Sequence, residues 1–286
     1  MKTFDAIIIG GGPAGISAAL YMVRANFSVA VFYSDGGDLS RAKKIDNYYG
    51  LPGVSGKDLF KTGHAQLAAL GGRLISGEAI GLEYDGVFVV KTADGEYSAK
   101  ATVLATGKPK QTVKIPGAEE FSGRGVSFCA TCDGFFYRGL PVGVLGAGEF
   151  AKEESDYLLN VASSVTVFTN GAQAATNFDS RCVMSTGKIL RLEGEKNLQR
   201  VVLEDGIAKI SGLFVALGTA SAADFAKKLG VLINSENISV DNYMKTNIPG
   251  LFAAGDCVGE PYQISAAVGE GAKAGLAAVK FLRSFK

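Results

Sequence analysis

Short apolar runs alternate with helical patterns along this chain, and the first such unit lies at the N-terminus. Residues 4–9 and 28–33 are apolar runs that predict strands, and residues 13–25 between them follow a helical pattern. Glycines at positions 10, 12 and 15 form a Gly-x-Gly-x-x-Gly turn before that helix. Such a turn lets the backbone approach a pyrophosphate, whose charge a helix N-terminus favours, so the unit predicts a dinucleotide-binding fold.

The same pattern returns in the middle of the chain as an internal repeat. Residues 141–145 predict a strand, Gly146-x-Gly148-x-x-Ala151 a second turn, residues 152–161 a helix and residues 165–168 the next strand. A strand-like run at 200–204 is followed by a turn signal at Asp205-Gly206 and then by the apolar run 212–217. Residues 265–283 predict a final helix. We therefore expect an α/β protein with two nucleotide-type domains, in which the C-terminal segment returns to the first.

A closely spaced cysteine pair, Cys129-Ala130-Thr131-Cys132, precedes the second unit and is followed by Asp133. Two cysteines at this spacing can close a disulfide, exchange it through a thiolate and pass on two electrons, while the neighbouring acid manages protons. Half of a zinc site is the structural alternative, but His64 is the only histidine and no second spaced pair occurs. We expect no metal, and Cys182 and Cys257 are predicted to be small buried thiols.

Composition and charge narrow the function classes. At 286 residues with 47% hydrophobic positions, the chain can bury one large core or two modest ones. A net charge of +1 gives no footprint for nucleic acid or an anionic membrane. Residues 6–23 carry no charge, but the glycines and Pro13 break them where a membrane helix needs continuity. Four cysteines without a secreted framework favour the reducing cytoplasm.

Four motifs together carry a family resemblance over essentially the whole chain. They are the first glycine turn, Ala105-Thr106-Gly107, the run from Gly123 through the cysteine pair to Tyr137, and Ala253-Ala254-Gly255-Asp256. With them the chain resembles the low-molecular-weight thioredoxin reductases. The resemblance implies two Rossmann-like domains of the three-layer ββα type, the second inserted into the first. Residues 1–116 and 218–286 would bind FAD, and residues 117–217 would carry the dithiol on a degenerate pyridine-nucleotide fold.

The resemblance also implies roles for individual residues. Cys132 would face the flavin, Cys129 would exchange with the substrate thioredoxin and Asp133 would act as acid/base. Arg124, Phe135 and Phe136 match positions for thioredoxin docking, with ordinary packing as the alternative for the two phenylalanines. A homodimer is expected. Non-covalent FAD would be held by Gly10, Gly12, Pro13, Ala14, Gly15, Ser34, Gly36, Gly37, Leu39, Asn47, Ala105, Thr106, Gly107, Asp256, Tyr262, Gln263 and Ile264.

The second unit departs from the family pattern where NADPH would bind. The family's basic His-Arg-Arg type string is replaced by residues 169–173, Thr-Asn-Gly-Ala-Gln, and no charged residue occurs from 165 to 178. Glu149 puts a carboxylate in the first helical turn, where it would repel a diphosphate. Tyr262 stands before Gln263 where the family often has arginine. NADPH is therefore not expected, and the chain resembles the ferredoxin-linked flavoenzyme thioredoxin reductases of anaerobic bacteria, with ferredoxin as electron donor.

Three other functions stay open at this point. The first is an NADPH- or NADH-dependent thioredoxin reductase with an atypical nucleotide site, since backbone groups alone can bind a pyrophosphate. The second is a dithiol oxidase that uses oxygen to form disulfides in a small substrate. The third is a non-catalytic flavoprotein redox sensor that binds partners according to its disulfide state.

Overall fold

The computed structural model describes residues 1–34, 36–108, 114–218, 222–234 and 237–285. The chain forms two compact units. Unit 1 comprises Met1–Pro109 and Ser221–Lys286, and unit 2 comprises Lys110–Ala220 between them. The domain boundaries expected from the sequence, 116/117 and 217/218, stay predictions.

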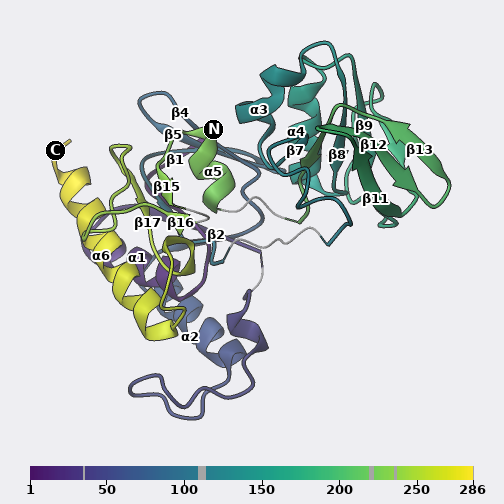
Figure 1. Ribbon diagram of the computed structural model, residues 1–286. Helices are drawn as coiled ribbons and strands as arrows, with labels where there is room; N and C mark the ends of the chain where they lie inside the picture. The colour runs from purple at the N-terminus through teal and green to yellow at the C-terminus, as the bar shows by residue number, and fades with distance from the viewer. Residues whose placement is uncertain (35, 109–113, 219–221, 235–236, 286) are drawn as a thin grey trace. The chain divides into compact units, whose positions relative to one another are not determined.

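Unit 1 is built on a seven-stranded sheet (Figure 1). Its order is β3 (Arg73–Ser76), β2 (Val29–Tyr33), β1 (Lys2–Ile9), β6 (Gly95–Leu104), β5 (Phe88–Thr92) and β4 (Gly81–Tyr84), with β17 (Leu251–Ala253) also paired to β6. The strands β3, β2, β1, β6 and β17 run parallel, whereas β5 and β4 continue antiparallel. β6 is long enough to pair with β5 along its first half and with β17 along its second half.

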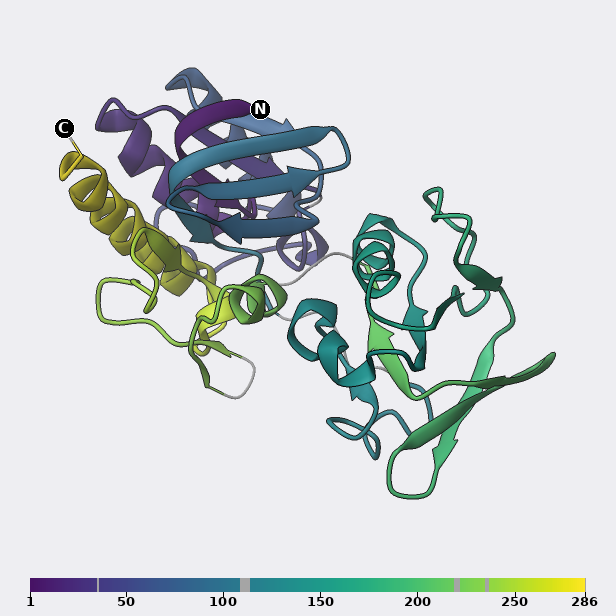
Figure 2. The same ribbon diagram turned by 90° about the horizontal axis from the view of Figure 1, so that it is seen from above.

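Two helices from opposite ends of the chain pack together on this sheet. α1 (Pro13–Arg24) and α6 (Ile264–Arg283) lie side by side in both views (Figures 1 and 2) and share a core with β1 and β2. A Cβ on Gly271 would lie 2.1 Å from the Ala14 carbonyl oxygen, and one on Gly275 would lie 2.6 Å from that of Ala18. Glycines in α6 therefore let the two backbones touch, which explains how the C-terminal segment joins the first domain.

The remaining elements of unit 1 are short, apart from one helix. They are η1 (Leu39–Arg41), α2 (Gly56–Ala69), α5 (Ala222–Lys228), β15 (Ile233–Asn234), β16 (Asn237–Ile238) and η3 (Asp256–Val258). Ser55 caps the start of α2 by accepting a hydrogen bond from the Asp58 backbone N–H at 3.1 Å.

Unit 2 carries a parallel five-stranded sheet and a separate antiparallel one. The parallel order is β10 (Val183–Ser185), β9 (Ser164–Phe168), β8 (Pro141–Leu145), β14 (Gly212–Val215) and β7 (Val126–Ser127). The antiparallel order is β11 (Ile189–Gly194), β12 (Leu198–Leu203) and β13 (Gly206–Lys209). The strand-like run predicted at 200–204 overlaps β12, and the turn signal at Asp205-Gly206 lies where β12 leads into the antiparallel strand β13. The parallel sheets of both units confirm the α/β fold class.

Three short helical segments complete unit 2: α3 (Ala130–Asp133), η2 (Gly134–Tyr137) and α4 (Glu149–Leu158). The predicted helix at 152–161 is wrong in its bounds, because α4 begins at Glu149 directly after its N-cap, Gly148. The first backbone N–H groups of a helix have no acceptor within the helix, so α4 can begin directly after the glycine turn. Among the described residues, no helix is long and apolar enough to cross a membrane.

Candidate dithiol and cofactor sites

Cys129 and Cys132 are joined in a disulfide at the start of α3. The S–S distance is 2.09 Å and the Cα atoms are 5.3 Å apart. Cys129 is the N-cap of α3, and its Sγ accepts a hydrogen bond of 3.2 Å from the Cys132 backbone N–H. Cys129 is 2% exposed, whereas Cys132 lies at the surface. Within the described part of the chain, no group of three or more His, Cys, Asp and Glu side chains is arranged to hold a metal.

The side chain of Asp133 is tied to the cysteine pair through Ser127, the last residue of β7. Ser127 Oγ donates to Asp133 Oδ2 at 2.6 Å and accepts from the Cys129 backbone N–H at 3.2 Å. Burial, reinforced by the Asp133 carboxylate, raises the pKa of the Tyr137 phenol. One hydroxyl therefore holds both the predicted acid and the backbone of Cys129. The sequence analysis missed Ser127 because a lone serine at a strand end carries no motif.

The aromatic pair after the dithiol is exposed. Phe135 and Phe136 are 68% and 75% exposed on η2, so ordinary packing is the wrong interpretation of these rings. Two large apolar side chains beside a redox pair form a surface suited to a protein partner. Arg124, the third predicted docking residue, is also exposed, and its guanidinium donates to the Glu120 carbonyl oxygen.

The first glycine turn has the shape of a pyrophosphate cradle. Gly10 has φ +119°, and a Cβ there would lie 2.1 Å from the Ala105 carbonyl oxygen. A Cβ on Gly15 would lie 1.9 Å from the Gly10 carbonyl oxygen. A Cβ on Gly12 meets nothing within 4 Å, and Gly12 caps α1 without any side-chain hydrogen bond. The turn is therefore closed on the protein side and open where a diphosphate would approach the helix N-terminus, so these residues fit FAD.

The other predicted cofactor residues follow the carboxyl ends of the parallel strands of unit 1, where open α/β sheets bind ligands. Ser34, Gly36 and Gly37 follow β2 and precede Leu39 in η1; Ala105, Thr106 and Gly107 follow β6; Asp256 follows β17; and Tyr262 and Gln263 precede Ile264, the first residue of α6. Asn47 Nδ2 donates to Gln263 Oε1 at 3.1 Å. Two predicted residues far apart in the sequence therefore meet, while their role in binding FAD stays a prediction.

A lysine side chain lies over the Tyr262 ring at one end of this group. The Lys108 ammonium nitrogen is 3.7 Å from the centroid of the Tyr262 ring. Burial raises the pKa of Asp256, while the positive charge of Lys108 acts in the opposite direction. The sequence analysis did not assign Lys108 to the cofactor site, and no local motif marks it.

His64 contacts the glycine turn from α2. Its Nε2–H donates to the Gly11 carbonyl oxygen at 2.8 Å, and its ring packs against Tyr33 and Phe60. The sequence considerations treated His64 only as a possible zinc ligand, whereas the structure shows that it fixes one carbonyl of the turn. Position on a helical face alone does not reveal such a long-range hydrogen bond.

The second glycine turn keeps its shape but is partly covered. A Cβ on Gly146 would lie 2.2 Å from the Ala216 carbonyl oxygen, as tight as at the first turn, and Gly148 is open. The Ala175 backbone N–H donates to the Ala147 carbonyl oxygen at 2.7 Å. The segment after β9 therefore lies against the turn, and half-buried Glu149 begins the helix there.

Basic side chains near this second turn have acidic partners. Lys152 Nζ is 2.6 Å from Asp156 Oδ2, and Arg181 Nη2 is 2.8 Å from Asp179 Oδ2. The Arg181 guanidinium holds the pKa of Asp179 at about 2. Lys188, from beyond β10, borders Gly171, whose Cβ would lie 3.2 Å from Lys188 Cγ. Counting charges between 165 and 178 missed this lysine because it belongs to the later connection between β10 and β11.

Cys182 and Cys257 are buried free thiols, which confirms the prediction for both. Burial raises the pKa of the Cys257 thiol to about 12 and also raises that of Cys182. Neither sulfur is therefore a thiolate near neutral pH.

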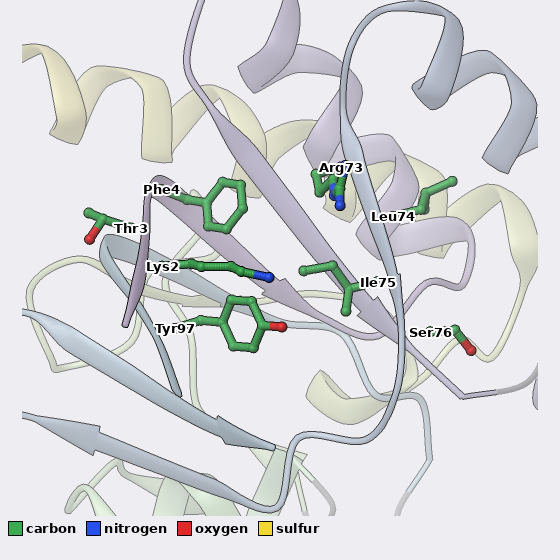
Figure 3. Close-up of a pocket in the computed structure, with 8 residues that line it drawn as sticks. All are labelled: Lys2, Thr3, Phe4, Arg73, Leu74, Ile75, Ser76 and Tyr97. Carbon is green, nitrogen blue, oxygen red and sulfur yellow. The ribbon is translucent and has the colours of Figure 1, made fainter. Parts of the chain in front are cut away.

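An open hollow of about 670 Å³ also occurs in unit 1 (Figure 3). It is lined by Lys2, Thr3, Phe4, Arg73, Leu74, Ile75, Ser76 and Tyr97. Lys2 to Phe4 form the beginning of β1, at the opposite end of that strand from the glycine turn. None of the lining residues belongs to the predicted cofactor set.

Comparisons with known proteins agree with this pair of sites. A family model described as pyridine nucleotide-disulphide oxidoreductase matches residues 4–271. A thioredoxin reductase from Aquifex aeolicus is 33% identical over 307 residues, covering 100% of this chain and 95% of the relative. The solved atypical thioredoxin reductase TRi from Desulfovibrio vulgaris Hildenborough is 39% identical, with a TM-score of 0.91 and 99% of each chain covered. A ferredoxin-flavin thioredoxin reductase structure from Clostridium acetobutylicum is 32% identical, with a TM-score of 0.74 and 99% of each chain covered.

Proposed function

The chain belongs to the pyridine nucleotide-disulphide oxidoreductase family and within it to the thioredoxin reductases, and on this premise we propose that reduced ferredoxin, not NADPH, is its electron donor. Membership itself establishes an FAD-dependent oxidoreductase that reduces thioredoxin through a cysteine pair, here Cys129 and Cys132. The proposal concerns the donor and the roles of individual residues.

The contact that carries the donor proposal lies at the second glycine turn. The Ala175 N–H donates to the Ala147 carbonyl oxygen at 2.7 Å, so the chain's own backbone lies against the turn that would receive the NADPH pyrophosphate. Glu149 adds a carboxylate at the helix start, where it satisfies the helix dipole and repels an incoming diphosphate. A pyrophosphate would have to displace the segment and tolerate the charge.

Paired basic side chains support the same conclusion. A 2′-phosphate is ordinarily held by arginines after the second strand of such a unit. Here Lys152 and Arg181 are each bonded to a carboxylate, Asp156 and Asp179 respectively. Their positive charges are therefore offset locally, which leaves less attraction for a phosphate.

Ferredoxin is a sufficient reductant for this reaction. A ferredoxin near −400 mV and a thioredoxin near −270 mV differ by about 130 mV, or roughly 6 kcal/mol for two electrons. The Clostridium acetobutylicum relative bears both ferredoxin and flavin in its name. A flavin is a suitable adaptor because flavin chemistry accommodates both one-electron and two-electron exchange.

FAD would be held by the first glycine turn and by the residues after β2, β6 and β17. When bound, it supplies the electron pair that opens the Cys129–Cys132 disulfide. In the proposed exchange, Cys129 thiolate attacks one sulfur of the thioredoxin disulfide, forms a mixed disulfide and releases a thioredoxin thiolate. Cys132 then attacks Cys129 Sγ, which re-forms the internal disulfide and releases reduced thioredoxin.

The surroundings of the two sulfurs support these roles. The Cys132 N–H donates to Cys129 Sγ, which stabilises negative charge on that sulfur when the disulfide opens. Cys129 is buried in the disulfide, so the start of α3 has to move to present it to thioredoxin. Asp133, held by Ser127, would transfer the proton between the cysteines and the leaving thiolate. Phe135 and Phe136 would contact thioredoxin around the dithiol.

A homodimer and a cytoplasmic location belong to the same proposal. The family resemblance supports the dimer, and the free thiols of Cys182 and Cys257 suit a reducing compartment. Light scattering of the purified protein tests the first expectation, since a monomeric mass contradicts it.

NADPH is the competing donor, and two features favour it: Gly148 is open, and Lys188 borders the loop after β9. The deciding experiment measures thiol production from oxidised thioredoxin under anaerobic conditions with reduced ferredoxin, NADPH or NADH. Ferredoxin alone is expected to sustain turnover, and Cys129→Ser is expected to abolish it. Equal or faster turnover with NADPH overturns the donor proposal. Production of peroxide from dithiols in air would instead indicate the oxidase, and thioredoxin binding that changes with redox state without turnover would indicate the sensor.

A further inference from the structure

A buried carboxylate lies at the start of the dithiol helix. Glu154 on α4 is 2% exposed, and its Oε2 accepts a hydrogen bond of 2.6 Å from the backbone N–H of Ala130. Ala130 is the first residue of α3 and directly follows Cys129. The first N–H groups of a helix have no acceptor within that helix. Glu154 supplies such an acceptor from a different element.

The helix that begins directly after the second glycine turn, α4, therefore also supports the redox pair. In Figure 1, α4 lies beside α3, and the two helices are in contact. At the far end of α3, a Cβ on Gly134 would lie 3.1 Å from Tyr157 Cε1 and 3.2 Å from Leu158 Cδ2. α4 thus meets the dithiol segment between the two cysteines, at Ala130, and again after them, at Gly134.

Two groups act on Cys129 Sγ in opposite directions. The Cys132 N–H points its positive end at this sulfur and favours a thiolate. The Glu154 carboxylate accepts a hydrogen bond from the Ala130 nitrogen, which is two covalent bonds from the Cys129 Cα. Its negative charge therefore disfavours a further negative charge on Cys129 Sγ. Like charges repel more strongly in a buried site than in water, so the Glu154 contribution is not screened away.

We propose that Glu154 is a positioning residue for the redox pair, which fixes the start of α3 and by its charge favours the disulfide over the reduced cysteines. Reduction breaks the Cys129–Cys132 bond, takes two electrons from the flavin and up to two protons from solvent, and leaves a thiol or thiolate on each sulfur. A carboxylate nearby makes this step less favourable. The reduced pair is correspondingly a stronger reductant, and Cys129 keeps a more nucleophilic sulfur.

The inference rests on the dithiol chemistry of the family and is independent of the electron donor. Glu154→Gln tests it, because the amide keeps an acceptor oxygen and nearly the same size but removes the charge. The FAD-loaded full chain is equilibrated anaerobically with dithiothreitol buffers, and the reduced cysteines are counted by alkylation and mass spectrometry. The equilibrium constant for reduction is expected to rise about tenfold, which is about 30 mV for a two-electron couple.

Glu153→Gln is the matched control, since it removes the same charge from the next position of the same helix. It is expected to leave the potential at the wild-type value. A potential for Glu154→Gln that equals the control, or that falls, overturns the proposal. A purely structural role would lower the melting temperature without raising the potential.

Glu154→Asp covers the case in which the glutamine variant does not fold. The shorter side chain keeps the charge but withdraws it from Ala130, so a smaller rise in potential is expected. An unchanged potential in a folded aspartate variant also overturns the proposal.

Discussion

Replacing Ser127 by alanine tests whether Asp133 works as the acid/base of the dithiol. Ser127 is 5% exposed at the end of β7, and its Oγ bridges Asp133 Oδ2 at 2.6 Å and the Cys129 backbone N–H at 3.2 Å. The alanine removes both bonds, together with a longer contact of 3.4 Å from Ser127 Oγ to the Cys129 carbonyl oxygen. We expect slower exchange with thioredoxin and unchanged FAD content, because Ser127 lies in unit 2 and the glycine cradle lies in unit 1.

The size of the effect follows from the two lost bonds. A hydrogen bond to a charged group contributes about 1.5–3 kcal/mol, and an unsatisfied buried N–H costs about 1–3 kcal/mol. If the hydrogen bond from Ser127 holds the Asp133 carboxylate in place for proton transfer, the energy of that bond is added to the activation barrier of the exchange when the bond is lost. Each ~1.4 kcal/mol is a tenfold change in rate, so exchange is expected to slow about 10- to 100-fold.

The assay is a single-turnover reaction between chemically reduced enzyme and oxidised thioredoxin, which avoids any electron donor. Ser155→Ala is the matched control: Ser155 is fully buried in the same unit, but its hydroxyl donates to the Lys152 carbonyl oxygen within α4, at 2.8 Å. Both variants are expected to lose some stability, and only Ser127→Ala is expected to lose exchange rate. Equal rates in the two variants would refute the role given to the Ser127–Asp133 bond.

Three further predictions concern the cysteines, the glycine cradle and a partly buried acid. Cys129→Ser is expected to abolish thioredoxin turnover and to retain FAD. Cys132→Ser is expected to trap a mixed disulfide with thioredoxin, which non-reducing electrophoresis would detect. Trapping by the Cys129 variant instead would reverse the roles of the two cysteines. Gly12→Ala is expected to weaken FAD binding at an unchanged melting temperature of the apoprotein, because its Cβ meets nothing within 4 Å. Gly15→Ala should lower that melting temperature, since its Cβ would lie 1.9 Å from a carbonyl oxygen; equal melting temperatures would contradict this. Burial raises the pKa of Glu270 above its usual 4.5, so the folded state holds the proton more tightly and ionisation lowers stability as pH rises through that window. The Glu270→Gln apoprotein should therefore have a higher melting temperature than wild type at pH 7 and the same melting temperature below pH 4.5. Thermal scans in which the two melting temperatures do not converge at low pH would contradict this prediction.

The sequence predicted the features that local patterns encode. Short-range periodicity predicts the strands beside both glycine turns and the α/β class. The glycines predict the turns themselves, because a side chain at these positions would prevent close approach of the backbone. The structure confirms these features. The bounds of α4 were wrong because apolar periodicity begins later than the helix itself, whose first turn is set by Gly148.

The contacts that long-range folding creates could not be predicted in the same way. His64 and Glu154 each use one polar atom to hold a backbone group distant in sequence, and no motif surrounds them. Ser127 holds a backbone group only two residues away, but a lone serine at a strand end carries no motif either. Lys188 reaches the segment after β9 from the connection between β10 and β11. In each case the residue type is ordinary for its element, and only the packing of strands and helices makes the contact visible.

The most direct test of the donor is anaerobic reduction of the bound flavin, followed by its loss of absorbance in a stopped-flow instrument. The FAD-loaded protein is mixed in separate experiments with excess reduced ferredoxin, NADPH and NADH. We predict rapid bleaching by ferredoxin and none on the same timescale by either nucleotide, because the segment at Ala175 lies against the second turn and Glu149 places a carboxylate at its helix start. Rapid bleaching by NADPH, with slow bleaching by ferredoxin, would overturn the donor proposal and assign the chain to the nucleotide-dependent thioredoxin reductases.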